Sequence, residues 1–155
     1  MRVLTLDVRL FGNFSLQRNG VPVTTVTSQR LQSLLAYLLL NRQAPQSRQH
    51  LAFLFWPDTN EKQARTNLRN LLYQLRQALP DVEHFIEIKN KSLQWRPDAP
   101  YTLDVAQFER SVAQAQPTEN PRELQAALIV AIESYRGDLL SHCFDEWVPA
   151  ERERL

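Results

Sequence analysis

Cysteine is nearly absent from this sequence, and so are the features that mark secreted or membrane proteins. Cys143 is the single cysteine, so no disulfide can form within the chain, and a reducing compartment is favoured. No apolar run approaches the roughly 20 residues that span a bilayer, and the first residues do not resemble a secretory signal. These absences predict a cytoplasmic protein without a membrane partner.

The sequence also lacks the usual patterns of enzymes and metalloproteins. It has three glycines, no glycine-rich loop that could hold a phosphate, and no recognisable pairing of a nucleophile with a base. His50, His84 and His142 are widely separated along the chain, and His142-Cys143 has no matching ligands at zinc spacing. We therefore expect no catalytic activity, no cofactor and no metal site.

Charge is distributed unevenly along a chain whose net charge is +1. Residues 1–100 contain 13 Lys and Arg against 7 Asp and Glu, a balance of +6, whereas residues 101–155 contain 5 against 10, a balance of −5. A basic part joined to an acidic part suggests two functions, the first directed at a polyanion. Charge by itself does not identify that polyanion.

The first 26 residues have the pattern of a small antiparallel sheet. Apolar residues alternate with period two between Val3 and Phe11, which is typical of a half-buried strand. Gly12-Asn13 provides a turn, and Asn19-Gly20 is a strong hairpin signal because both residues accept positive φ. The predicted strands are 3–11, 14–17 and 21–26.

After residue 26 the apolar spacing changes to the 3.6-residue period of amphipathic helices. Thr27 or Ser28 can cap a first helix, and Ser47 a second. A third helix, from Glu61 to Leu79, is the clearest element of the chain. The predicted elements are a helix ending near 41, a short helix from 47 to 55, the helix 61–79, a hairpin at 85–95, a loop at 97–100, and helices starting at 104 and near 121.

The helix predicted at 61–79 separates two kinds of side chain. One stripe contains Ala64 and the leucines at 68, 71, 72, 75 and 79, whereas the opposite side has four cationic groups and no carboxylate after Glu61. A solvated helix usually mixes charges. A face rich in Arg, Asn, Thr and Tyr offers donors for phosphates and for base edges in a major groove. The exposed residues are Lys62, Thr66, Arg69, Asn70, Tyr73 and Gln77, with Arg65 and Arg76 along one flank.

Taken alone, this helix could be an ordinary Arg-rich surface helix, but the order of elements favours nucleic acid. A helix, a short helix, a turn, a basic helix and a hairpin with Lys89 and Lys91 at its tip make the plan of a winged helix-turn-helix. The tip could equally be a solvated turn. We predict an α+β fold: a winged helix-turn-helix with an N-terminal antiparallel sheet and a C-terminal hairpin wing.

Several segments resemble the antibiotic-regulatory activators, the SARP class. Three segments resemble the DNA-binding domain of that class, which is an OmpR-type winged helix. They are residues 51–58 (LAFLFWPD), 64–69 (ARTNLR) and 75–79 (LRQAL). Four later segments resemble the bacterial transcriptional activator domain, which follows the DNA-binding domain in this family. They are residues 101–108 (YTLDVAQF), 135–140 (YRGDLL), 145–148 (DEWV) and 151–155 (ERERL).

The resemblance implies two domains, a DNA-binding domain over 1–100 and, over 101–155, the truncated beginning of a helical, tetratricopeptide-like activator domain. It also implies activation of transcription from repeats in promoter DNA, with RNA polymerase as a further partner and self-association on DNA. One feature departs from the family. The turn Asn90-Lys91-Ser92 has no glycine, so we expect a wing whose shape differs from the one usual in the family.

Each candidate residue has an expected role. Base edges or adjacent phosphates are expected for Thr66, Arg69, Asn70 and Tyr73. Phosphates are expected for Arg48, Lys62, Arg65, Arg76, Lys89 and Lys91, although Arg65 could pair with Asp58 and Arg48 could be solvated. Trp56 is expected to pack between the second and third helices. The competing functions are a protein-interaction module whose basic helix binds an acidic partner, and an RNA-binding winged helix.

Overall fold

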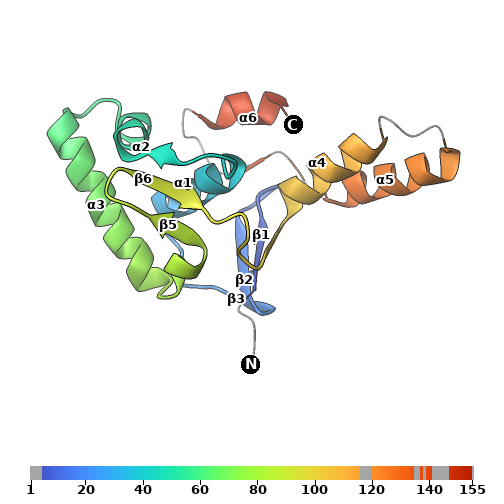
Figure 1. The fold of residues 1–155 in the computed structure, drawn as a ribbon, viewed down its shortest axis with the longest axis horizontal. Helices are drawn as coiled ribbons and strands as arrows, with labels where there is room; N and C mark the ends of the chain where they lie inside the picture. Colours follow the sequence, from blue (N-terminus) through green and yellow to red (C-terminus); the bar gives the residue numbers. More distant parts are fainter. Residues whose placement is uncertain (1–4, 116–119, 135–136, 138, 141–146, 155) are drawn as a thin grey trace. The chain divides into compact units, whose positions relative to one another are not determined.

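The structure is a computed structural model that describes residues 5–115, 120–134, 137, 139–140 and 147–154 (Figure 1). Contacts divide the chain into two compact units, one formed by Thr24–Ala99 and the other by Met1–Val23 with Pro100–Leu155. The combination of helices and sheets confirms the predicted α+β class. The domains 1–100 and 101–155 stay a prediction, and the contacts group the N-terminal strands with the later helices.

The unit Thr24–Ala99 contains three helices in the predicted order. Helix α1 spans Gln29–Leu40, α2 spans Arg48–Phe55 and α3 spans Glu61–Ala78. The Ser47 side chain accepts a hydrogen bond from the N–H of His50 at 3.2 Å, and the Asn60 side chain accepts one from the N–H of Gln63 at 2.8 Å. These bonds satisfy amide groups that the start of a helix leaves without partners, so the local sequence determines where α2 and α3 begin.

A three-stranded sheet joins the predicted hairpin to the start of α2. Its strands are β4 (Gln46–Ser47), β5 (Ile86–Ile88) and β6 (Ser92–Trp95), in the order β4-β6-β5, and a short 3-10 helix, Val82–His84, precedes β5. The sequence did not predict β4, because two residues show no apolar period. Beside β4, the backbone N–H of Arg48 donates to the carbonyl of Lys91 at 2.9 Å, which fastens the hairpin to the first residue of α2.

The core of this unit comes from the apolar faces of its helices and hairpin. The helix α3 packs against α1 and α2. All six residues of its predicted apolar stripe are buried, including Leu79 directly after the helix: Ala64, Leu68, Leu71, Leu72, Leu75 and Leu79. Phe55, Phe85 and Trp95 are also almost completely buried. Each buried large side chain stabilises the fold by roughly 1.5–3 kcal/mol. This packing fixes which side of α3 faces away from the core.

The other unit contains a four-stranded sheet in the order β3-β2-β1-β7. Its strands are β1 (Leu6–Arg9), β2 (Ser15–Arg18), β3 (Val21–Pro22) and β7 (Tyr101–Leu103). The third predicted strand, 21–26, is therefore shorter than expected, and Pro22, which has no N–H for the sheet ladder, suits the edge position of β3. Residues 1–4 of the first predicted strand lie outside the described residues.

Strand β7 is the main difference from the prediction for this unit. The sequence suggested that residues 101–108 open a helical domain, but Tyr101–Leu103 pairs in parallel with β1, with Leu6 opposite Tyr101. Three residues are too few to show a strand period, and the partner strand lies more than 90 positions earlier in the chain. No local pattern could therefore reveal this pairing.

The side chain of Asp104 ties the start of the next helix, α4 (Asp104–Ala115), to the end of β1. Its carboxylate accepts hydrogen bonds from the N–H groups of Leu10 at 2.9 and 3.0 Å, Phe11 at 3.0 Å and Val105 at 2.8 Å. Burial raises the pKa of Asp104 against the opposing effects of these N–H groups and of Arg9. One carboxylate thus satisfies backbone donors of both the strand end and the helix start.

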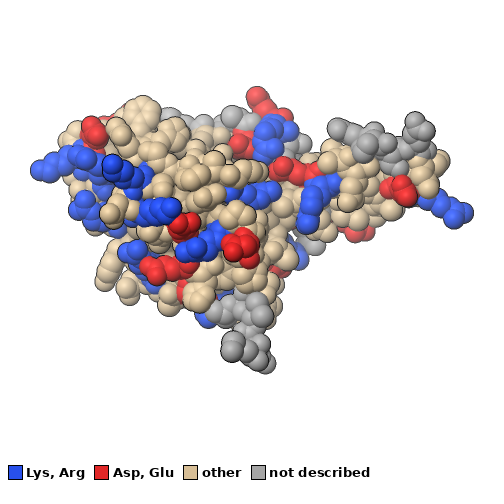
Figure 2. Space-filling model, in the orientation of Figure 1, with Lys and Arg blue, Asp and Glu red and all other residues tan. Residues whose placement is uncertain are grey.

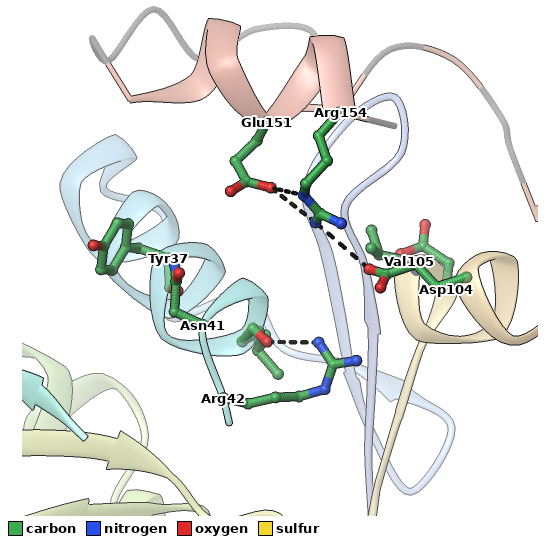
Figure 3. Close-up of polar contacts among 9 residues, drawn as sticks. Tyr37, Asn41, Arg42, Asp104, Val105, Glu151 and Arg154 are labelled. Carbon is green, nitrogen blue, oxygen red and sulfur yellow. Dashed lines mark hydrogen bonds and ion pairs between the residues drawn. The ribbon is translucent and has the colours of Figure 1, made fainter. Parts of the chain in front are cut away.

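Helix α4 packs against α5, which spans Pro121–Ser134 (Figure 1). A further helix, α6, spans Val148–Arg154, and its Arg154 guanidinium contacts Glu151 at 2.8 Å and Glu109 at 3.6 Å (Figure 3). Helices thus begin at 104 and 121, as predicted. Part of the sequence pattern used for this region lies outside the described residues, namely residues 118–119, 135–136, 138, 145–146 and 155.

Candidate nucleic-acid interface

Helix α3 separates its leucines from its cations as the sequence predicted. Thr66 is half-buried, and its hydroxyl donates to the carbonyl of Lys62 at 3.1 Å, within the helix. The Tyr73 ring is 65% exposed although it is large and apolar for most of its surface. The other predicted face residues of α3 are all exposed: Lys62, Arg65, Arg69, Asn70, Arg76 and Gln77.

Most cations of this face have no carboxylate partner in the part of the chain that the structure describes. Among the residues that the structure describes, no carboxylate lies within ion-pair distance of Lys62, Arg65 or Arg69. The alternative pair of Arg65 with Asp58 is therefore not formed. Arg76 does contact Glu83, at 3.6 Å, but both side chains are about half-exposed or more, and such surface pairs contribute only about 0–1 kcal/mol. Figure 2 shows the resulting gathering of Lys and Arg over the part of the surface that α3 forms, at the left of the view.

The tip of the β5–β6 hairpin adds two lysines. The N–H of Lys89 donates to the carbonyl of Ser92 at 2.9 Å and closes a two-residue turn. In the described chain the non-glycine residues with positive φ are Asn19 and Leu140, so this turn closes without a left-handed residue and does not require the glycine that it lacks. Lys89 contacts Glu87 at 3.0 Å, whereas Lys91 is exposed and has no such pair among the described residues.

Arg48 connects α2, α3 and the hairpin tip. It is the first residue of α2 and is half-buried, and its Nε atom is buried without a hydrogen-bond partner among the described residues. Burial lowers the pKa of Arg48, and the neighbouring charges of Arg76 and Arg69 lower it further. Arg48 is a candidate phosphate ligand from the sequence, but the effect of the two α3 arginines on its pKa could not be predicted, because 21 or more positions separate them from Arg48.

Trp56 follows α2 and is half-buried. Its ring meets that of Phe55 edge to face, with centroids 6.1 Å apart, and the guanidinium of Arg30 lies 5.5 Å from its centroid. Trp56 therefore packs on the end of α2 and on a residue of α1. The sequence interpretation had placed it between α2 and α3.

Two further observations bear on the classes of function that the sequence left open. No helix among the described residues combines the length and apolar character needed to cross a membrane. No group of three or more His, Cys, Asp or Glu side chains in the described part of the chain is arranged to hold a metal ion. His142 and Cys143, which the sequence analysis considered as ligands, lie outside that part.

The arrangement defines a class of fold: helices α1, α2 and α3, with a hairpin attached to the start of α2. No protein-family model matches the sequence, and neither does any curated protein. Among solved structures, the chain is similar to EmbR of Mycobacterium tuberculosis, solved in complex with a low-affinity phosphopeptide, with a TM-score of 0.78 and 20% sequence identity. The match covers 97% of this chain and 41% of the EmbR chain. At this identity the similarity establishes the fold.

Proposed function

We propose that this chain is the DNA-binding part of a transcriptional regulator of the SARP type. Helix α3 enters the major groove of double-stranded DNA, and the β5–β6 hairpin acts as the wing on the backbone or minor groove. The observation that carries this proposal is the exposed face of α3, which has four cations, three of them without a carboxylate partner in the described chain. The fold similarity to EmbR, a regulator of that family, supports the same function.

The residues of the α3 face divide by chemistry. Arg69 suits O6 and N7 of guanine, and Asn70 suits N6 and N7 of adenine, in both cases through two hydrogen bonds. Tyr73 offers an exposed ring and hydroxyl. The Thr66 hydroxyl already donates within the helix, so its methyl group is the part best placed for a thymine methyl. Phosphate contacts are proposed for Arg48, Lys62, Arg65, Arg76, Lys89 and Lys91, which position the helix without selecting sequence.

The remaining parts of the proposal depend on the resemblance to the SARP class. Residues 101–155 would form the beginning of the tetratricopeptide-like activator domain, and the chain would act in the cytoplasm as an activator without enzymatic activity. Neighbouring copies would bind repeats in promoter DNA, with RNA polymerase as the further partner. The packed pair α4 and α5 agrees with a helical region after residue 103.

Selection of bound sites from randomised duplexes tests the proposal, followed by a mobility-shift assay at physiological salt. We expect an enriched sequence that binds at nanomolar to submicromolar protein, as specific DNA-binding proteins do. Arg65→Glu should abolish the shift because it places a carboxylate against the phosphates. The matched control is Arg110→Glu, which makes the same charge change at an exposed position of α4.

The competing functions predict different outcomes of the same assay. No shift of any duplex at micromolar protein would favour a protein-interaction module with an acidic partner. Displacement of the duplex by a small excess of single-stranded RNA would favour RNA binding. Equal weakening by Arg65→Glu and Arg110→Glu would show that α3 is not the binding surface.

A further inference from the structure

Two neutral amide side chains of α3 are bonded to each other at the edge of its exposed face. The Nε2 atom of Gln63 donates a hydrogen bond to the Oδ1 atom of Asn67 at 2.8 Å. Gln63 is exposed and Asn67 is half-buried, and a separation of four positions places them on adjacent turns of one side of the helix. We call these two residues the amide pair.

The amide pair borders the exposed face on the side opposite to its arginines. At about 3.6 residues per turn, Gln63 lies about 60° of rotation to one side of Thr66, and Arg69 lies about 60° to the other side. Gln63 is therefore as close to the middle of the face as Arg69 is. The residues that follow Gln63 on its own side are also uncharged: Asn67, Asn70 and Gln74. Neutral amides bind phosphates more weakly than arginine does, but they suit the edge of a base.

The bond within the amide pair leaves Gln63 with the groups that a contact to adenine requires. A glutamine amide has two N–H donors and an oxygen acceptor, and the bond to Asn67 uses one of the donors. The remaining N–H matches N7 of adenine, which accepts, and the oxygen matches the N6 amino group, which donates. Guanine presents two acceptors in the same groove, so it would leave the glutamine oxygen without a donor.

Asn67 restricts the orientation in which the Gln63 amide is presented. A glutamine side chain loses much rotamer freedom when it becomes ordered, and the bond to Asn67 limits that freedom before DNA binds. The backbone of Gln63 is held as well, because its N–H donates to the Asn60 side chain at 2.8 Å. Gln63 is the third residue of α3, and the N-terminal residues of a recognition helix are those that contact base edges.

We propose that Gln63 reads one adenine in the major groove and that Asn67 is the positioning residue that holds the Gln63 amide for this contact. The inference rests on the proposed function and adds to it an A·T base pair recognised at the beginning of α3. The competing role is weak stabilisation of the helix, which amide pairs four positions apart also provide. The two roles are distinguishable, because stabilisation of the helix does not depend on the identity of a base.

Modified duplexes test the adenine contact in the whole chain. Each adenine of the selected site is replaced in turn by the analogue in which carbon replaces N7. Gln63→Ala should weaken binding of the unmodified site by about 5- to 150-fold, and at one adenine the analogue should weaken the wild type but not Gln63→Ala. The matched control is Gln114→Ala, which removes an exposed amide from α4 and should behave as the wild type does on every duplex.

Substitutions of Asn67 test the positioning role. Asn67→Ala should reduce the effect of the analogue at the same adenine, and the double variant with Gln63→Ala should bind that site no more weakly than Gln63→Ala alone. Asn67→Asp keeps an oxygen that can accept from Gln63, so it should restore the effect of the analogue even though its charge weakens binding to all duplexes. An equal loss on every duplex for Asn67→Ala, with the effect of the analogue unchanged, would contradict the positioning role.

The result that overturns the adenine contact is distinct from the one that overturns DNA binding. If the selected duplex binds but every analogue weakens the wild type and Gln63→Ala by the same factor, the adenine contact is wrong and the proposed function stands. If no duplex binds at micromolar protein, the proposed function is wrong and the adenine contact is refuted with it.

Discussion

The salt dependence of DNA binding follows from a count of the cations that are assigned to phosphates. Six residues are assigned to phosphates: Arg48, Lys62, Arg65, Arg76, Lys89 and Lys91. If each displaces counterions, log affinity should fall with log salt concentration with a slope of about −5, since each contact contributes about −0.9. Raising the salt from about 50 to about 200 mM would then weaken binding by about 10³-fold.

Fluorescence anisotropy of a labelled duplex at several salt concentrations measures this slope. Lys91→Ala should reduce its magnitude by about one and weaken all sequences alike, because Lys91 has no internal partner among the described residues. Lys89→Ala should have a smaller effect, because Lys89 already contacts Glu87 at 3.0 Å. A slope shallower than about −2, or one that Lys91→Ala leaves unchanged, would refute this assignment of phosphate contacts.

Two further substitutions test the fold that supports the interface, each by denaturant unfolding. Leu75→Ala should destabilise the protein by about 2–5 kcal/mol, because Leu75 is completely buried. Gln74→Ala, at the exposed neighbouring position, should have little effect. Similar losses of stability for the two variants would contradict the packing of α3. Asp104→Ala should cost about 1–3 kcal/mol, because it leaves the backbone N–H groups of Leu10, Phe11 and Val105 without acceptors. Asp98→Ala removes an exposed carboxylate and serves as its control; equal losses would exclude the role assigned to Asp104.

The sequence was sufficient for the helices, whose apolar period and caps are local. The stripe from Ala64 to Leu79 and the cap at Ser47 lie within single elements, and both are present in the structure. The paired strands β1 and β7 show where local reasoning ends, since their register depends on residues more than 90 positions apart.

The candidate interface likewise has features that local sequence predicts and features that depend on distant residues. The exposed face of α3 follows from helical period alone, and the separation of its cations from its leucines was predicted. The lowering of the Arg48 pKa by the charges of Arg69 and Arg76 depends on how α2 packs on α3, which no spacing within either helix determines. The pairing of β4 with β6, which brings the hairpin tip to Arg48, was missed for the same reason.

The most direct test of the central claim compares Arg69→Ala with the wild type on a selected duplex and on an unrelated duplex of equal length, at one salt concentration. Base contact by Arg69 predicts a loss of about 1–3 kcal/mol on the selected sequence, and a clearly smaller loss on the unrelated one. An equal loss on both duplexes would contradict the claim that the exposed face of α3 reads base edges in the major groove.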